Sequence, residues 1–293
     1  MSEEIDFISD LSQPDKHKHT HNRQIIDQSI PDDKILDHLL SIPKEQLIPW
    51  EDCYLPSDGL YYGWEDGRVS VRAMTQNSEK ILATKRLAQT GQSVDHLFRD
   101  CCKFPDNFDP SQLLIGDRVF LLYFLRGITH GNMYEYVITC PNTDCGKTSA
   151  QQYDLNNLAT TAKRANHNLG REPFRISLPY LSDTTSRDFW VDVRFLRSSD
   201  LTDMLIRNKA INKTSVDLDE NIGRTIVSVM GTTDKFKIRS FVQSLHAKDV
   251  ATIRMWYKDN TPGIDTTVNV TCPHCSGTFR MELPITESFF RQS

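Results

Sequence analysis

The chain has 293 residues, of which 38% are hydrophobic and 25% charged, and its formal net charge of −5 argues against an overall field that attracts nucleic acid. Its longest apolar run, residues 119–125, is too short to span a bilayer. The N-terminus is acidic, which predicts no secretory signal, and the seven cysteines therefore indicate metal or redox chemistry in a reducing compartment rather than disulfides.

Residues 1–48 are predicted to form an extended polar N-terminal arm. Polar and charged residues dominate this segment, and its scattered apolar anchors bury too little surface to fold alone. One short helix is expected between Pro31 and Pro43. Its apolar face would consist of Ile35, Leu36, Leu39 and Leu40. An arm of this kind suggests docking along a partner or along the body of the same chain.

The ordered part is predicted to begin near Trp50, and strand and helix signals then follow each other up to the first pair of cysteines. In chain order these are a strand at 69–72, helices at 78–87 and 93–103, a loop at 104–110, a helix at 118–127 and a strand at 134–139.

The second half repeats this order. After a Leu-Pro pair at 178–179, the sequence predicts a strand at 191–194, helices at 198–205, 221–230, 237–245 and 249–258, and a strand at 267–271. Asp117 precedes Cys140 by 23 residues, and Asp249 precedes Cys272 by the same interval. We interpret the chain as an α+β protein with two diverged tandem repeats, 49–160 and 161–293, with coincidence of short motifs as the alternative.

Each predicted repeat ends in a cysteine turn, Cys140-Pro-Asn-Thr-Asp-Cys145 or Cys272-Pro-His-Cys275. Two to four residues between cysteines let one tight turn present both thiolates to a tetrahedral ion. We therefore predict one structural Zn²⁺ per chain in a zinc-ribbon-like site, with Cys140, Cys145, Cys272 and Cys275 as ligands. Turns that have lost their metal are one alternative. Redox activity is another, but Cys272 leads into a strand rather than a helix N-terminus that would activate it.

The remaining signals favour structure over catalysis. The chain contains no Gly-rich phosphate loop, no HExxH and no GxSxG, and four thiolates would leave the metal no open position, so we predict that it is not an enzyme. Arg72 and Arg194 end equivalent strands and would form salt bridges between the repeats or bind an acidic partner. The other three cysteines have no ligand-type partners and are predicted to be buried: Cys53, Cys101 and Cys102.

Three segments followed by a Cys-Pro knuckle carry a family resemblance: Leu55-Pro-Ser-Asp-Gly-Leu-Tyr-Tyr62, Val69-Ser-Val-Arg72 and Leu114-Ile-Gly-Asp-Arg118. The series resembles the T4-type baseplate hub and hub-assembly proteins of contractile-tailed bacteriophages, including zinc-ribbon-bearing members. The resemblance covers residues 50–150 well and the second half loosely.

This resemblance implies a non-enzymatic structural or assembly component of the tail baseplate hub. Its partners would be other hub proteins and the end of the tape-measure protein, and it would act in the virion or in the host cytoplasm during assembly. The competing hypothesis is a zinc-ribbon protein that binds nucleic acid or serves transcription. The acidic balance and the lack of an Arg/Lys stripe beside the knuckles count against it.

Overall fold

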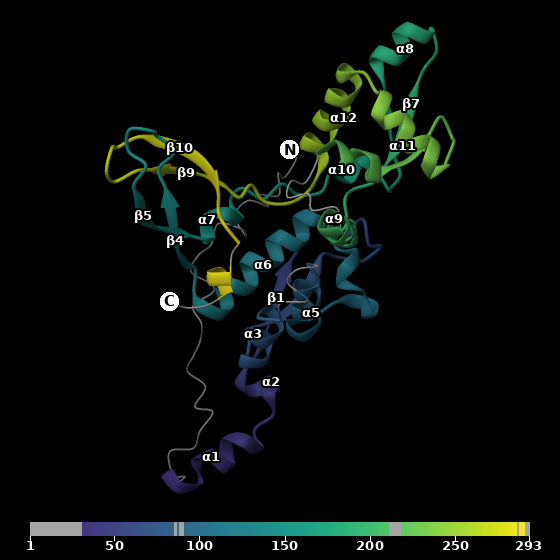
Figure 1. Cartoon of the computed structure of the whole chain (residues 1–293). Helices are drawn as coiled ribbons and strands as arrows, with labels where there is room; N and C mark the ends of the chain where they lie inside the picture. The colour runs from purple at the N-terminus through teal and green to yellow at the C-terminus, as the bar shows by residue number, and fades with distance from the viewer. Residues whose placement is uncertain (1–30, 85–86, 88–90, 211–217, 286, 291–293) are drawn as a thin grey trace, which may run out of the picture.

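The computed structural model of the chain describes residues 31–84, 87, 91–210, 218–285 and 287–290. Most of the predicted arm, residues 1–30, lies outside the described residues. Its described part forms α1 (Asp32–Ser41), which begins after Pro31 and ends before Pro43 as predicted, and α2 (Lys44–Leu47). Figure 1 shows α1 standing away from the rest of the molecule.

The first half of the body is built on a three-stranded antiparallel sheet of order β1-β2-β3. Helices are inserted between its second and third strands, and a long apolar helix, α6, follows. The elements are β1 (Trp50–Tyr54), β2 (Arg68–Arg72), α3 (Gln76–Leu82), α5 (Gln92–Cys101), β3 (Cys102–Lys103), η1 (Pro105–Asn107), η2 (Pro110–Gln112) and α6 (Ile115–His130). Alternation places Val69 and Val71 of β2 in the core, as expected for a half-buried strand.

The second half is built on another three-stranded antiparallel sheet, of order β6-β7-β8, again with helices between its second and third strands. The elements are η3 (His167–Leu169), β6 (Phe174–Ser177), α8 (Pro179–Thr185), β7 (Trp190–Val193), α9 (Ser198–Ala210), α10 (Leu218–Thr225), β8 (Ile226–Val229), α11 (Lys235–Ser244) and α12 (Ala247–Asn260). The helix predicted for residues 221–230 is partly wrong, because α10 ends at Thr225 and β8 follows. The run Ile226-Val-Ser-Val229 is rich in β-branched residues and pairs with β7.

Each half continues into a two-stranded hairpin. These hairpins are β4 (Met133–Thr139) with β5 (Thr148–Asp154), which leads into α7 (Asn156–Ala159), and β9 (Thr267–Thr271) with β10 (Thr278–Glu282). Figure 1 shows the two hairpins together on one side of the molecule. Their inner faces carry Tyr136, Ile138, Val268 and Val270, which are buried in one cluster. The hairpins therefore form a small shared core between segments that are far apart in the chain.

The buried side chains form two clusters, one centred on each three-stranded sheet. The C-terminal segment, including η4 (Glu287–Phe290), joins the first cluster. The ring of Phe289 lies 4.9 Å from Tyr123 and 5.0 Å from Tyr134, measured between centroids. The fold is α+β as predicted, and the strand order of the two sheets is the same. The division into repeats at residue 160 stays a prediction, because the C-terminal hairpin shares its core with the first half.

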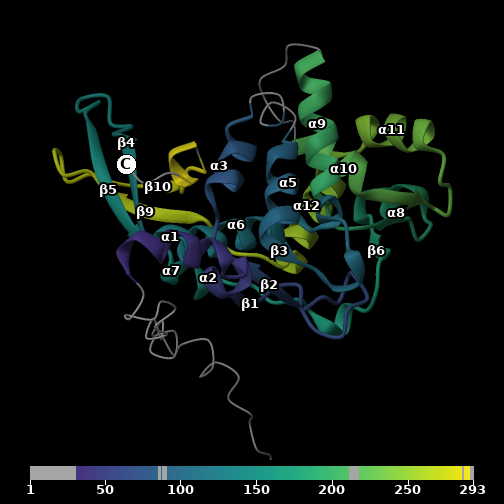
Figure 2. The ribbon, with the colours of Figure 1, turned by 90° about the horizontal axis from the view of Figure 1, so that it is seen from below.

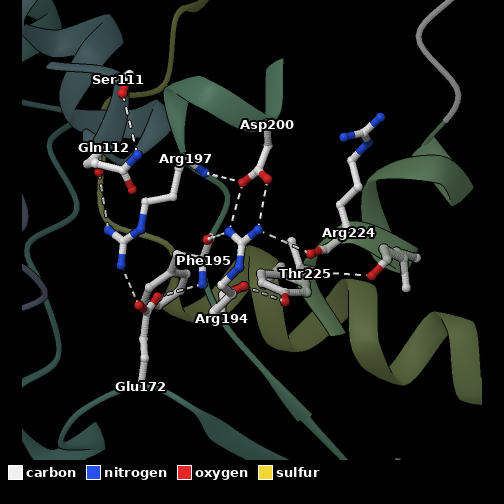
Figure 3. A network of polar contacts seen from close by, with 11 residues as sticks. Ser111, Gln112, Glu172, Arg194, Phe195, Arg197, Asp200, Arg224 and Thr225 are labelled. Carbon is white, nitrogen blue, oxygen red and sulfur yellow. Dashed lines mark hydrogen bonds and ion pairs between the residues drawn. The ribbon is translucent and has the colours of Figure 1, made fainter. Parts of the chain in front are cut away.

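The two halves are joined by a short backbone pairing. Leu114 and Arg197 form an antiparallel bridge, and the amide of Ser198 donates to the carbonyl of Leu113 over 2.8 Å. The Arg197 guanidinium extends this junction by donating to Glu172 and, over 3.4 Å, to the carbonyl of Gln112 (Figure 3). Residues just before α6 and just before α9 thus hold the two sheets in a fixed relation.

The salt bridges predicted between the halves are wrong. Arg72 pairs with Asp100 at 3.1 Å, and Arg194 pairs with Asp200 at 2.7 Å, so each arginine stays within its own half. Figure 3 shows Arg194 between Asp200 and the carbonyl of Arg224. The reason is local, because each arginine lies at the end of its strand, next to a helix of the same half that carries the partner carboxylate. Arg118 forms a buried ion pair with Asp95 inside the first half, and both side chains contact Ser198 of the second half.

None of the described helices combines the length and apolar character that a membrane crossing requires.

Candidate metal centre

The two cysteine turns have the same backbone construction. In the first, the amide of Cys140 donates to the carbonyl of Lys147 over 3.0 Å. In the second, the amide of Cys272 donates to the carbonyl of Gly277 over 2.9 Å. Each bond closes the turn at the end of a hairpin, so β4 and β9 deliver one cysteine each and the turns deliver the others.

Each turn also contains a residue with left-handed backbone immediately after its second cysteine. Gly146 has φ of 53° and Ser276 has φ of 57°. Glycine adopts this conformation without steric cost, whereas serine does so less readily. The amide of Ser276 donates to the carbonyl of Cys272 over 2.9 Å, which holds it there. The left-handed residue reverses the chain so that both thiols of a turn face the same side.

The four sulfurs lie together. The Sγ atoms of Cys140 and Cys275 are 3.7 Å apart, those of Cys145 and Cys272 are 3.8 Å apart, and all four lie within 4.8 Å of one another. With Zn–S bonds of about 2.3 Å, a tetrahedral site separates its sulfurs by about 3.8 Å. The two distances between the turns fit that geometry. Each short distance joins one cysteine from the first turn to one from the second.

The turns also arrange hydrogen bonds toward the sulfurs. The backbone amides of His274 and Cys275 lower the pKa of the Cys272 thiol to about 7. The Asn142 amide acts in the same direction on Cys140, but burial and the neighbouring thiols outweigh it and raise the pKa of Cys140 to about 12. Four thiolates this close would repel one another strongly without a cation between them. The donor set therefore suits a divalent metal ion.

Among the described residues, these four cysteines are the one group of His, Cys, Asp and Glu side chains placed to hold a metal ion. The structure thus brings together all four predicted ligands. Asp144 and His274 lie within the turns and are not part of the group. If a metal fills the site, four sulfurs complete its coordination and leave no position for a substrate or water.

The remaining cysteines are buried, as predicted: Cys53, Cys101 and Cys102. Burial raises the pKa of Cys101 to about 11 and that of Cys102 well above its ordinary value. These thiols are therefore protonated at neutral pH. They behave as small apolar side chains in the core of the first half.

Two aspartates on the helices that precede the cysteine-bearing hairpins were noticed in the sequence only for their spacing. Asp117 on α6 accepts a hydrogen bond from the amide of Ser57 over 3.0 Å, and Asp249 on α12 accepts one from the amide of Tyr180 over 2.8 Å. Both carboxylates are fully buried. The signal that could have found this role is the Leu-Pro pair directly before each amide, because it creates a turn whose exposed N–H needs an acceptor.

The comparison that identifies the family covers most of the chain. A family model described as "T4 bacteriophage base plate protein" matches residues 52–291. The chain belongs to this family. The match includes both cysteine turns and all but the first two residues of the two three-stranded sheets, and it begins after the arm. Searches of the curated proteins and of the solved structures each find no significant match. Membership makes the chain a component of a phage baseplate, located in the tail of the virion.

Proposed function

We propose that the chain is a structural or assembly component of the baseplate hub, without enzymatic activity, and that one Zn²⁺ stabilises it. The observation that carries the metal is the pair of sulfur distances, 3.7 Å between Cys140 and Cys275 and 3.8 Å between Cys145 and Cys272. These are the separations that tetrahedral zinc requires, and a reducing compartment keeps such thiols free to bind it.

Zinc in this position would act as a clamp. Its ligands come from two turns that the sequence separates by more than a hundred residues, and both turns lie inside the family match. Binding free energy at four-thiolate sites is on the order of 10 kcal/mol, which is comparable with the stability of a whole domain. The ion would therefore fix the C-terminal hairpin on the first half of the body.

We also propose that the two halves are diverged repeats, in which case the zinc would join two copies of one unit. Three parallels support this interpretation: the strand order of the sheets, the contacts of Asp117 and Asp249, and the closure of the two cysteine turns. A duplicated unit in which each copy contributes half of a metal site would need both copies to be folded before the ion binds. Metal binding would then occur only after both halves have folded and before the chain joins the baseplate.

The proposed partners are other hub proteins and the end of the tape-measure protein, met in the host cytoplasm during assembly or retained in the virion. The family match supports a tail partner, and the choice of the hub rests on the resemblance of the opening segments. Enzymatic roles are disfavoured because a four-sulfur site offers no open coordination position.

The test combines metal analysis with capture of partners. Tagged full-length chain is recovered from infected cells, its zinc is measured, and copurifying phage proteins are identified. We expect about one zinc per chain and recovery of hub proteins. A double variant, Cys145→Ser with Cys272→Ser, should lose both. Metal-free chain that still assembles into baseplates would overturn the zinc clamp, and recovery of tail proteins from outside the hub would overturn the hub assignment.

A further inference from the structure

The helix of the arm carries two adjacent rows of side chains with different chemistry. Leu36 and Leu40 are 65% and 76% exposed and lie four residues apart, on one row of α1. Asp33 and Asp37, also exposed and four residues apart, form the neighbouring row. Residues at this spacing share a helix face, so α1 presents an apolar row bordered by carboxylates. Leucines exposed to this extent on an isolated helix are suited to contact with a partner.

The outward face of α12 has the complementary pattern. Ala251 and Met255 lie four residues apart and are exposed, Met255 to 58%. Arg254 and Lys258 form the neighbouring row at the same spacing and are also exposed. The opposite face of α12 packs into the core of the second half through Ile253. The outward face is thus an apolar row bordered by cations, with the same repeat as α1, and the row ends at exposed Asp259 one turn after Met255.

The net charges of the arm and of α12 have opposite signs, as do the charged rows on α1 and α12. Residues 1–48 contain ten acidic and five basic side chains, so the arm alone carries as much net negative charge as the whole protein. Residues 247–260, which form α12, contain three lysines and arginines, all of them exposed. Of the two carboxylates of α12, Asp249 is buried and accepts hydrogen bonds from the amides of Tyr180 and Leu181, and Asp259 is exposed. Opposite charges at the two sites favour their encounter.

We propose that α1 of one copy of the chain binds the outward face of α12 in a second copy. Leu36 and Leu40 would cover Ala251 and Met255, and the two rows of charge would border this contact. Figures 1 and 2 show α1 and α12 on different sides of the body, and in Figure 1 they lie toward its opposite ends. Eight residues, 42–49, connect α1 to β1 and include the short helix α2, so α1 stands on a short connection from which it can meet a neighbour.

This contact joins two different surfaces and is therefore head-to-tail. Repetition of such a contact closes into a ring when the rotation between copies permits, and otherwise gives an open chain. The contact uses two short helical faces, which corresponds to a small interface and to association in the micromolar range. The proposal does not depend on zinc or on the hub assignment, since neither α1 nor the outward face of α12 includes any of the four clustered cysteines.

The test is sedimentation velocity of the full-length chain over a range of concentrations, with charge reversals on each face. One variant carries Asp33→Lys with Asp37→Lys, and the other carries Arg254→Glu with Lys258→Glu. All four positions are exposed, so the body should remain folded. We expect the wild-type chain to associate with increasing concentration, less strongly at high salt, and each variant to associate at least about tenfold more weakly.

Variants that restore opposite charges on the two faces distinguish a direct contact from a nonspecific effect of charge. A chain that carries all four reversals, and a mixture of the two variants, should associate to within about threefold of wild type, because opposite charges face each other again. A matched control reverses two charges on the neighbouring helix α11, Lys235→Glu with Lys237→Glu, and should leave association unchanged. A wild-type chain that stays monomeric would overturn the proposal, as would failure of the mixture to associate, or loss of association in the α11 control.

Discussion

Asp117 and Asp249 each accept a hydrogen bond from the backbone amide that follows a Leu-Pro pair, at Ser57 and Tyr180 respectively. Each aspartate lies on the long helix that precedes a cysteine-bearing hairpin. The carboxylate thereby fixes the end of the first strand of a sheet to the helix that delivers half of the metal site. The same contact made twice links the two sheets to the geometry of the four sulfurs.

Asp117 predicts a pH dependence of stability. Burial raises its pKa from 3.8 to about 6, although hydrogen bonds from Ser57 and Tyr62 act in the opposite direction. The folded state therefore binds this proton more tightly than the unfolded state does. The contribution of Asp117 to the free energy of unfolding is fully present below about pH 4 and is lost as pH rises through about 6, with a total on the order of 3 kcal/mol.

The substitution Asp117→Asn should remove this dependence while keeping the side-chain volume. The measurement is urea unfolding of wild type and variant at several pH values from 4 to 7. The difference between their free energies of unfolding should change by up to about 3 kcal/mol across this range. The same change at exposed Asp259 is the matched control. Parallel curves for wild type and Asp117→Asn would contradict the prediction.

Removal of the proposed metal should destabilise the chain strongly. Cys145→Ser deletes one sulfur of the cluster, whereas Cys102→Ser changes a buried thiol outside it. We expect chelation to lower the thermal midpoint of wild type by roughly 10–20 °C, corresponding to a loss of at least about 5 kcal/mol. Cys145→Ser should start from the lowered midpoint and show no further response to chelator.

The control Cys102→Ser is expected to lose stability through its buried hydroxyl but to keep the response to chelator. Differential scanning calorimetry with and without chelator separates these outcomes. An equal response to chelator in Cys145→Ser and in wild type would refute the assignment of the four sulfurs.

The parts of the site that could be predicted from the sequence are those fixed by local spacing. The cysteine turns follow from two short intervals, and α1 follows from the prolines that bound it. The pairing of Cys140 with Cys275, rather than two independent turns, required the inference that distant segments converge. The sulfur distances support that inference.

The features that sequence reasoning missed depend on tertiary contacts. Residues 226–229 read as the end of a helix but form β8, because β7 offers an unpaired edge beside them. Arg72 and Arg194 end similar strands, yet the carboxylates within reach of each are determined by how α5 and α9 pack. Periodicity alone contains no information about which edge or which charge a segment will meet.

Phe289 anchors the C-terminal segment, and its removal should be costly. The side chain is fully buried and its ring contacts Tyr123 and Tyr134, while the hydroxyl of Tyr134 donates to the carbonyl of Pro284 over 2.8 Å. Phe289→Ala should lower the free energy of unfolding by about 3–5 kcal/mol, because it leaves a cavity beside α6 and β4. Chemical denaturation measures this loss.

The matched control for this change is Phe236→Ala on α11, where the ring is 79% exposed. Its effect should stay within about 0.5 kcal/mol. Similar losses for both substitutions would indicate that the C-terminal segment does not pack as described.

The two halves approach each other closely at Gly116, and this contact predicts a steric effect. A Cβ atom at Gly116, in the first turn of α6, would lie 1.9 Å from the carbonyl oxygen of Pro262, which follows α12. Because that oxygen is backbone, it cannot move aside as a flexible side chain would. Gly116→Ala should therefore force α6 away from the segment after α12 and lower the free energy of unfolding by at least about 1–3 kcal/mol.

The helical position Gly223 is a control, since the nearest atom to its Cβ would be a Val242 methyl at 3.8 Å. Gly223→Ala should be neutral or stabilising by up to about 1 kcal/mol. Urea unfolding of both variants measures the contrast, and equal effects would show that the two halves are not in contact at Gly116.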